Sequence, residues 1–138
     1  MLTEADFAGW LDRYKAAWEA RDPDAAMALF AVDASYRETP FAAPMRGRAA
    51  IGDYWRDRVQ AAQAAVAFSC DVLAVTGDTG LAHWRAQFDW RPTRRRVALD
   101  GIFLCRFRDG SDGDLRCAVL EEWWHRRAAE SPGEGKLP

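Results

Sequence analysis

The spacing of apolar residues changes once along the chain, from a helical period to a period of two. Up to about residue 62 the apolar side chains recur every three or four residues, which is typical of helices packed on a core. From Val66 to Arg127 they alternate with polar ones, in segments separated by turn residues such as Gly77-Asp78 and Pro92-Thr93. Helices followed by antiparallel strands predict an α+β fold with the helices packed on one face of a curved sheet.

Capping residues mark where the predicted helices begin. Thr3, followed by Asp6 in the first turn, is typical of a helix N-terminus, and so is Asp22-Pro23. The third helix should begin after Gly47. The expected elements are helices over about 3–20, 22–30 and 48–62, a short strand near Tyr36, and four long strands over about 66–76, 83–91, 96–108 and 115–127.

Length and charge restrict the classes of function. A chain of 138 residues suits a single domain, expected over 1–127, and the aperiodic segment AAESPGEGKLP predicts a disordered tail over 128–138. The formal net charge of −2 gives no overall attraction to nucleic acid or anionic membrane. No apolar run has the length of a membrane span, and the N-terminus lacks the basic and apolar regions of a signal peptide.

The cysteine and histidine patterns argue against metal and disulfide chemistry. Three cysteines without a CxxC spacing suggest reduced thiols and a cytoplasmic protein. The sequence has no HxH or HExxH spacing and no glycine-rich phosphate loop, so neither a metal nor a cofactor is expected.

Two segments of the chain resemble a known superfamily. One is AAWEARDPDAAMALFAVDASYRETPFAAPMRGRAAIGDYW, which looks like the N-terminal half of the nuclear transport factor two-like superfamily. The other is LEEWWHRR, which is similar to the last strand of its SnoaL-like members. The superfamily also includes ketosteroid isomerases and limonene epoxide hydrolases. The resemblance spans about residues 5–127 and implies a cone-shaped, cystatin-like fold with an apolar pocket, and a homodimer formed through the outer sheet face.

Glu38 follows the run DASYR, where similar isomerases hold the aspartate that shuttles a proton. The resemblance therefore implies a general base at Glu38, on the same strand face as Tyr36. A carboxylate inside an apolar cavity loses hydration, which raises its pKa and suits it to proton transfer near neutral pH. The alternative is a structural glutamate at the cavity mouth, or one paired with an arginine such as Arg46.

Tyr14 lies on the apolar face of the first predicted helix. Its spacing matches the tyrosine that donates a hydrogen bond to the developing oxyanion in ketosteroid isomerases. The alternative is a core tyrosine whose hydroxyl is satisfied by Tyr54. The second acid of those isomerases falls on Phe103, which has no donor. Asp100 should face the opposite side unless a bulge at Gly101 intervenes, so a steroid isomerase is not expected.

Glu122 matches the carboxylate that SnoaL-like cyclases and limonene epoxide hydrolases carry on their last strand. Because Glu121 and Glu122 are adjacent in a strand, one of them must face the interior. The inward carboxylate is either catalytic or held in a salt bridge. The arginine and aspartate that epoxide hydrolases use fall on Trp84 and Ala86, so that mechanism is not expected.

Seven tryptophans in so short a chain indicate an aromatic core, an aromatic pocket wall, or both. A pocket walled by such rings would take a flat, apolar or aromatic ligand. Any one of these residues can equally be plain core packing. The residues expected to line the pocket are Trp10, Trp18, Phe30, Tyr36, Tyr54, Trp55, Trp84, Phe88, Phe103 and Trp124.

These residues together predict a small-molecule-pocket protein. The first hypothesis is a cofactor-independent acid–base enzyme of the isomerase, cyclase or dehydratase kind, acting on an apolar carbonyl compound. Glu38 would move a proton beside the carbonyl, and Tyr14, with or without a protonated Glu122, would stabilise the enolate oxygen. The alternative is a non-catalytic ligand-binding or dimerisation module of the same fold.

Overall fold

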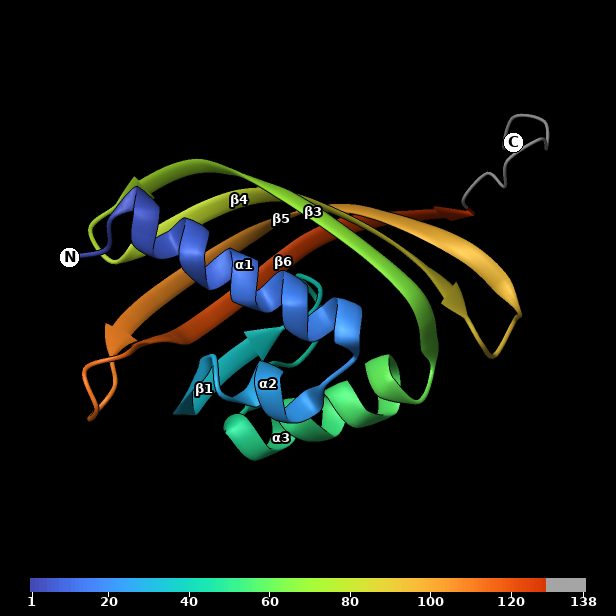
Figure 1. The fold of residues 1–138 in the computed structure, drawn as a ribbon, viewed down its shortest axis with the longest axis horizontal. Helices are drawn as coiled ribbons and strands as arrows, with labels where there is room; N and C mark the ends of the chain where they lie inside the picture. The colour runs from blue at the N-terminus through green and yellow to red at the C-terminus, as the bar shows by residue number, and fades with distance from the viewer. Residues whose placement is uncertain (129–138) are drawn as a thin grey trace.

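The computed structural model describes residues 1–128, and residues 129–138 lie outside the described residues. The segment predicted as a tail falls almost entirely there, although its first residue, Ala128, still belongs to the last strand. In chain order the elements are α1 (Glu4–Ala20), α2 (Pro23–Met27), β1 (Phe30–Arg37), β2 (Met45–Arg46), α3 (Arg48–Tyr54), the π-helix η1 (Trp55–Gln60), β3 (Gln63–Thr76), β4 (Thr79–Trp90), β5 (Arg95–Asp109) and β6 (Leu115–Ala128) (Figure 1).

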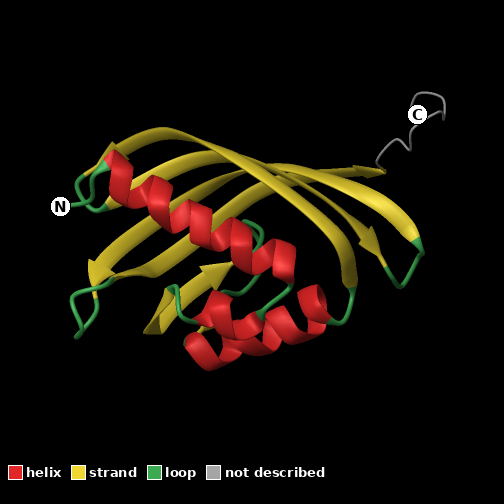
Figure 2. Cartoon of the chain, viewed as in Figure 1, coloured by secondary structure: helices red, strands yellow, loops and turns green. Residues whose placement is uncertain are grey.

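The strands form one curved, six-stranded sheet in the order β2-β1-β6-β5-β4-β3. All neighbouring strands are antiparallel except β1 and β6, which pair in parallel. Figure 2 shows the long strands arching over α1, with α2 and α3 on the same side of the sheet as α1. The predicted α+β fold, with helices on one face of a curved and mostly antiparallel sheet, is therefore confirmed.

The first helix begins and ends as its sequence predicts. The backbone N–H of Asp6 donates to Thr3 Oγ1 at 3.0 Å, and Asp6 Oδ2 accepts from the backbone N–H of Thr3 at 3.1 Å. The helix ends at Arg21, whose φ of 52° lies in the left-handed region. Its buried face is made of Phe7, Trp10, Leu11, Tyr14, Ala17 and Trp18.

Two helical predictions need correction. The second helix ends at Met27, and Phe30, which we assigned to it, is the first residue of β1. The carbonyl of Leu29 accepts from the backbone N–H of Cys117 at 2.9 Å, so pairing with β6 extends the chain here. The third helix continues as the wider η1, where the Ala61 N–H donates to the Arg56 carbonyl five residues earlier.

The long strands alternate as predicted. On β4, Trp84 and Phe88 are buried on the concave side, whereas Arg85 lies exposed on the outer side. The register of β5 runs without a bulge through Gly101, which pairs with Trp84 on one side and Trp124 on the other. Asp100 therefore stays on the outer face, where its Oδ1 lies 2.8 Å from Nε2 of His83.

Candidate functional site

Aromatic rings fill most of the space between α1 and the concave face of the sheet. The ring centroid of Tyr14, in the middle of α1, lies 5.3 Å from those of Trp10 and Phe103 and 5.6 Å from that of Trp55. Most of these contacts are edge-to-face, an arrangement that aromatic pairs favour. Among residues 1–128 this packing leaves one small hollow inside the cone and another at its end.

The inner void is the hollow beside Tyr14. Its volume of about 40 Å³ is room for a few water molecules. The mouth pocket, of about 70 Å³, is the hollow beside Glu38. The inner void is lined by Tyr14, Trp18, Tyr36, Tyr54, Trp55, Val59, Gln63, Trp84, Leu99, Glu122 and Trp124. The mouth pocket is lined by Glu38, Tyr54, Arg58, Gln63, Phe88, Trp90, Val97, Leu99, Trp124 and Arg126. Because four residues line both, the two hollows adjoin.

Glu122 is the carboxyl group that faces the interior. Its side chain is buried, with 4% of the residue surface exposed, and Tyr36 donates its hydroxyl hydrogen to Oε1 at 2.9 Å. Burial raises the pKa of Glu122 well above its ordinary value, the hydrogen bond from Tyr36 lowers it, and the nearby Glu38 carboxylate raises it. The neutral acid is therefore favoured. The adjacent Glu121 points outward and pairs with Arg37 at 3.7 Å.

Tyr14 finds a different partner from the one expected. Its hydroxyl oxygen lies 3.4 Å from that of Tyr36, so Tyr36 takes the place predicted for Tyr54. Since Tyr36 uses its only hydrogen on Glu122, the hydroxyl of Tyr14 must donate to Tyr36. Burial, followed by the charge of Glu122, raises the pKa of Tyr14. The three residues thus form one hydrogen-bonded chain on the wall of the inner void.

Glu38 lies at the mouth and not in the interior. It follows the end of β1 and is half-buried on the wall of the mouth pocket. Among the described residues it has no ion pair with Arg46, whose side chain is exposed. Its backbone carbonyl accepts the indole hydrogen of Trp124 at 2.8 Å, which fixes the loop against β6. Burial and the Glu38 carboxylate together raise the pKa of the Tyr54 hydroxyl.

Seven of the ten predicted wall residues line one hollow or both. They are Trp18, Tyr36, Tyr54, Trp55, Trp84, Phe88 and Trp124. Of the three candidate catalytic residues, Tyr14 and Glu122 meet in the inner void, whereas Glu38 lines the adjoining mouth pocket. Trp55 and Trp84 also carry buried indole N–H groups for which residues 1–128 supply no acceptor.

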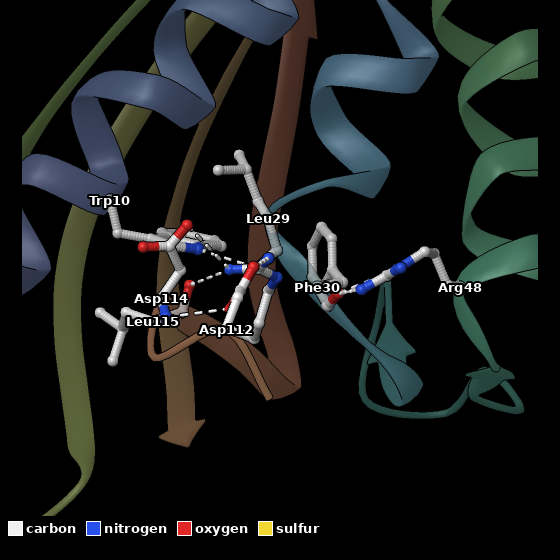
Figure 3. Close-up of polar contacts among 8 residues, drawn as sticks. Trp10, Leu29, Phe30, Arg48, Asp112, Asp114 and Leu115 are labelled. Carbon is white, nitrogen blue, oxygen red and sulfur yellow. Dashed lines mark hydrogen bonds and ion pairs between the residues drawn. The ribbon is translucent and has the colours of Figure 1, made fainter. Parts of the chain in front are cut away.

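Trp10, Phe30 and Phe103 are core residues and not pocket walls. Trp10 donates its indole hydrogen to the carbonyl of Leu29 at 3.0 Å, and Arg48 donates to the carbonyl of Phe30 (Figure 3). These two bonds hold α1 and α3 on the start of β1. Phe103 stacks on Trp84 with ring centroids 5.0 Å apart.

Several lining residues escaped prediction from the sequence. Gln63 is buried and accepts the indole hydrogen of Trp18 at 2.7 Å, and it lines both hollows. It is a polar residue at the junction of helix and strand, where neither period applies, so no pattern marks its face. Arg58, Trp90 and Arg126 come from η1, β4 and β6, which are far apart in the sequence. They line the mouth pocket because the fold brings these three elements together there.

Within residues 1–128 no cluster of three or more His, Cys, Asp or Glu residues could hold a metal ion. The same part of the chain contains no helix that is both long enough and apolar enough to cross a membrane. The polar groups that line the two hollows are carboxyl, hydroxyl, amide, indole and guanidinium groups.

Comparison with solved structures shows the same fold in other proteins. A conserved protein from Planctomyces limnophilus aligns with a TM-score of 0.76 at 15% identity, covering 90% of this chain and 97% of its own. The epoxide hydrolase/cyclase-like enzyme SalBIII, which acts in pyran ring formation in the polyether salinomycin, aligns with a TM-score of 0.75 at 19% identity, covering 94% and 100%. A ketosteroid isomerase-like protein from Erwinia carotovora atroseptica aligns with a TM-score of 0.67 at 16% identity, covering 89% and 98%.

Comparison with known sequences assigns the chain to a family. None of the curated proteins matches the chain. The family profile described as SnoaL-like domain matches residues 11–111, which is more than half of the chain. The match includes α1 from Leu11 onward, the Glu38 loop and all of β5. The helices, the curved sheet and this profile agree, and the chain belongs to the SnoaL-like domain family of the nuclear transport factor two-like superfamily.

Proposed function

We propose that this SnoaL-like protein is a cofactor-independent acid–base enzyme of the isomerase, cyclase or dehydratase kind, acting on a small apolar carbonyl compound. The observation that carries the proposal is Glu122, a carboxyl group buried among aromatic rings on the wall of a void. A neutral acid there can donate a hydrogen bond to a carbonyl oxygen. It then stabilises the negative charge that develops when the neighbouring carbon loses a proton.

The hydrogen-bonded chain supports a donor role for Glu122 and a supporting role for Tyr14. Tyr14 donates to Tyr36 and Tyr36 donates to Oε1 of Glu122, so neither phenol has a hydrogen left for a ligand. Within residues 1–128 no protein group hydrogen-bonds to Oε2 of Glu122. The acid hydrogen on that oxygen is free for the substrate, and the hydrogen bond that Oε1 accepts from Tyr36 strengthens this acid hydrogen as a donor.

Glu38 is the base of the proposed reaction. Its carboxylate takes the proton from the carbon beside the carbonyl, and the electron pair of that C–H bond becomes the C=C bond of an enolate. The enolate oxygen is held by the acid hydrogen of Glu122. When the substrate carries a C=C bond next to that carbon, the enolate is a conjugated dienolate. Return of the proton from Glu38 to its far carbon then re-forms the C=O bond, moves the C=C bond into conjugation with it and restores both carboxyl groups.

The volumes of the hollows restrict the substrate. With about 40 Å³ inside and about 70 Å³ at the mouth, a polycyclic molecule would need several aromatic side chains to move. The proposed substrate is therefore monocyclic or open-chain. The similarity in fold to SalBIII, an enzyme of pyran ring formation, supports the cyclase among the proposed reaction kinds.

Deuterium exchange tests the proposal. The protein is incubated in D₂O with a panel of small enones and β-keto compounds, and exchange beside the carbonyl is followed by NMR. We expect Glu38→Gln and Glu122→Gln each to lower the exchange rate by about 100-fold or more. Glu121→Gln is the matched control, since this neighbour faces outward and pairs with Arg37, and its rate should equal that of the wild type.

A non-catalytic ligand-binding module is the second candidate. The observation that favours it is the close aromatic filling of the cone, which leaves little room for a substrate to turn over. Binding of small apolar ligands without any exchange beyond the uncatalysed rate would select this alternative.

We further propose that two copies pair through the outer face of the sheet. Leu81, Ile102 and Leu104 are half-buried there and Trp123 is 43% exposed, with Ile102 directly opposite Trp123. Such a patch is typical of an interface. Trp123→Arg should shift the protein from dimer to monomer in analytical ultracentrifugation, whereas Phe41→Arg, at an exposed loop aromatic, should not.

The three free thiols support a reducing, cytoplasmic location.

A further inference from the structure

The mouth pocket combines two positive side chains with an apolar wall. Arg58, from η1, and Arg126, from β6, line it together with one carboxylate, Glu38. The other lining residues are mainly apolar, and Phe88 and Leu99 are among them. A ligand that enters therefore meets a local excess of positive charge, although the whole chain carries a formal net charge of −2.

Within residues 1–128 neither arginine is neutralised by an acidic side chain. Among the described residues no carboxylate lies within 4.0 Å of Arg58 or Arg126, and Glu38 is no exception. Six other arginines of the described residues are paired, among them Arg56 with Asp53 at 2.9 Å and Arg37 with Glu121 at 3.7 Å, whereas others, such as Arg46 and Arg127, have no carboxylate within 4.0 Å. The two guanidinium groups at the mouth thus keep their hydrogen-bond donors available for an anion.

The guanidinium of Arg58 is held in place without an acid. Its central carbon lies 5.2 Å from the ring centroid of Trp90, which lines the same pocket. Stacking on an indole orients the planar group and reduces the conformational entropy that binding must remove. The N–H edge of a stacked guanidinium stays free for a planar, two-oxygen acceptor.

We propose that the mouth pocket recognises a carboxylate, so that the ligand is a small aromatic or alicyclic acid whose apolar body lies toward the inner void. This inference rests on the proposed function in taking the same pocket as the ligand site. The inference gives the ligand two polar ends. Its carboxylate would bind Arg58 and Arg126, and its carbonyl group would accept the hydrogen bond from Glu122. A planar carboxylate matches the fork of an arginine with two hydrogen bonds.

Calorimetric titration of the full chain with three matched probes tests the inference. The probes are 3-phenylpropanoate, 3-phenylpropan-1-ol and 3-phenylpropyl phosphate. We expect the carboxylate to bind about tenfold more tightly than the alcohol, and its affinity to fall as salt is added. Equal affinity for carboxylate and alcohol, or no measurable binding of either, overturns the inference. Tighter binding of the phosphate than of the carboxylate overturns the assignment of the head group.

Arginine variants, each compared with a control arginine, test whether Arg58 and Arg126 are the groups that bind the carboxylate. Arg58→Gln and Arg126→Gln should each weaken carboxylate binding about fivefold to tenfold and change alcohol binding less than about twofold. Arg56→Gln and Arg127→Gln are the matched controls, because Arg56 pairs with Asp53 and neither Arg56 nor Arg127 lines the mouth pocket. Equal losses in the controls overturn the inference, since only a general charge effect would produce them.

The same titration separates this inference from the proposed catalysis. Glu122→Gln should lower the rate of deuterium exchange by about 100-fold or more and leave the preference for carboxylate over alcohol intact, because the two arginines remain. If the wild type shows no exchange but prefers the carboxylate, the acid–base reaction is wrong and the anion site stands. If exchange occurs without that preference, the anion site is wrong and the reaction stands.

Discussion

Tyr36 donates its phenolic hydrogen to Oε1 of Glu122 across 2.9 Å, inside an interior built of aromatic rings. The two residues are 86 positions apart in the chain and meet because β1 and β6 pair in parallel, with Tyr36 opposite Leu120. Through this bond the protonation state of Glu122 is coupled to the hydrogen bond between Tyr36 and Tyr14.

Tyr36→Phe should destabilise the protein and make Glu122 a weaker acid. The substitution removes the donor to Glu122 and leaves Tyr14 without its acceptor, so the free energy of unfolding should fall by about 1–3 kcal/mol. The pKa of Glu122 should rise, because the hydrogen bond from Tyr36 lowers it in the native protein. Urea denaturation and carbon-13 NMR titration of the carboxyl group measure the two effects. An unchanged titration of Glu122 would contradict the prediction.

Glu122 should make stability depend on pH. Its folded pKa is raised above the ordinary 4.5, so the buried acid keeps its proton in the folded state and releases it on unfolding. Its contribution to stability is then fully present below pH about 4.5 and is lost as pH rises toward the folded pKa, by at most about 1.4 kcal/mol per pH unit. Glu122→Gln has no such proton. The unfolding free energy of the wild type should therefore fall relative to this variant as the pH rises above about 4.5, and parallel pH curves would refute the argument.

Gln63→Leu should leave the indole of Trp18 without an acceptor. The lost bond measures 2.7 Å in a buried setting, so we expect the free energy of unfolding to drop by about 1–3 kcal/mol. Gln60→Leu, at an exposed position three residues earlier in η1, is the control and should change stability by less than about 0.5 kcal/mol. Equal losses in both variants would show that the buried bond is not the cause.

Gly101→Ala and Gly9→Ala should have opposite effects on stability. A Cβ at Gly101 would lie 2.7 Å from the carbonyl oxygen of Trp123 and 2.8 Å from Cβ of Trp124, contacts too short to keep without moving β6. A loss of about 1–3 kcal/mol is expected. A Cβ at Gly9 meets nothing within 4 Å on α1, where alanine favours the helix by about 1 kcal/mol. Thermal unfolding of both variants checks the signs, and a stabilised Gly101→Ala would disprove the close packing described.

Much of the fold could be predicted because its causes are local. The Thr3 cap begins α1, and the alternation around Trp84 and Phe88 identifies which side of β4 is buried. The failures lie where distant strands compete with local preference. Phe30 leaves the helix that its spacing favours because the carbonyl of Leu29 pairs with Cys117 on β6.

The candidate site was predicted less completely than the fold. The sequence pattern places one acid on each side of β6 and does not say which one faces the interior. The register with β5 decides this, because it sets Glu122 opposite the buried Phe103. Tyr14 is correctly placed on the buried face, but its partner is Tyr36 and not Tyr54. The size of the hollows has no sequence signature, because it depends on how the rings of many elements fill a shared volume.

The sequence by itself therefore determined the kinds and order of the elements, the faces they bury and the family to which the chain belongs, since periodicity and capping act over a few residues. The tertiary structure decided that Glu122 is the buried acid, that Tyr36 links it to Tyr14, and that Arg58 and Arg126 face the same pocket as Glu38. Each of these relations joins residues from elements far apart in the chain. Their distances come from strand register and ring packing, which no local pattern encodes.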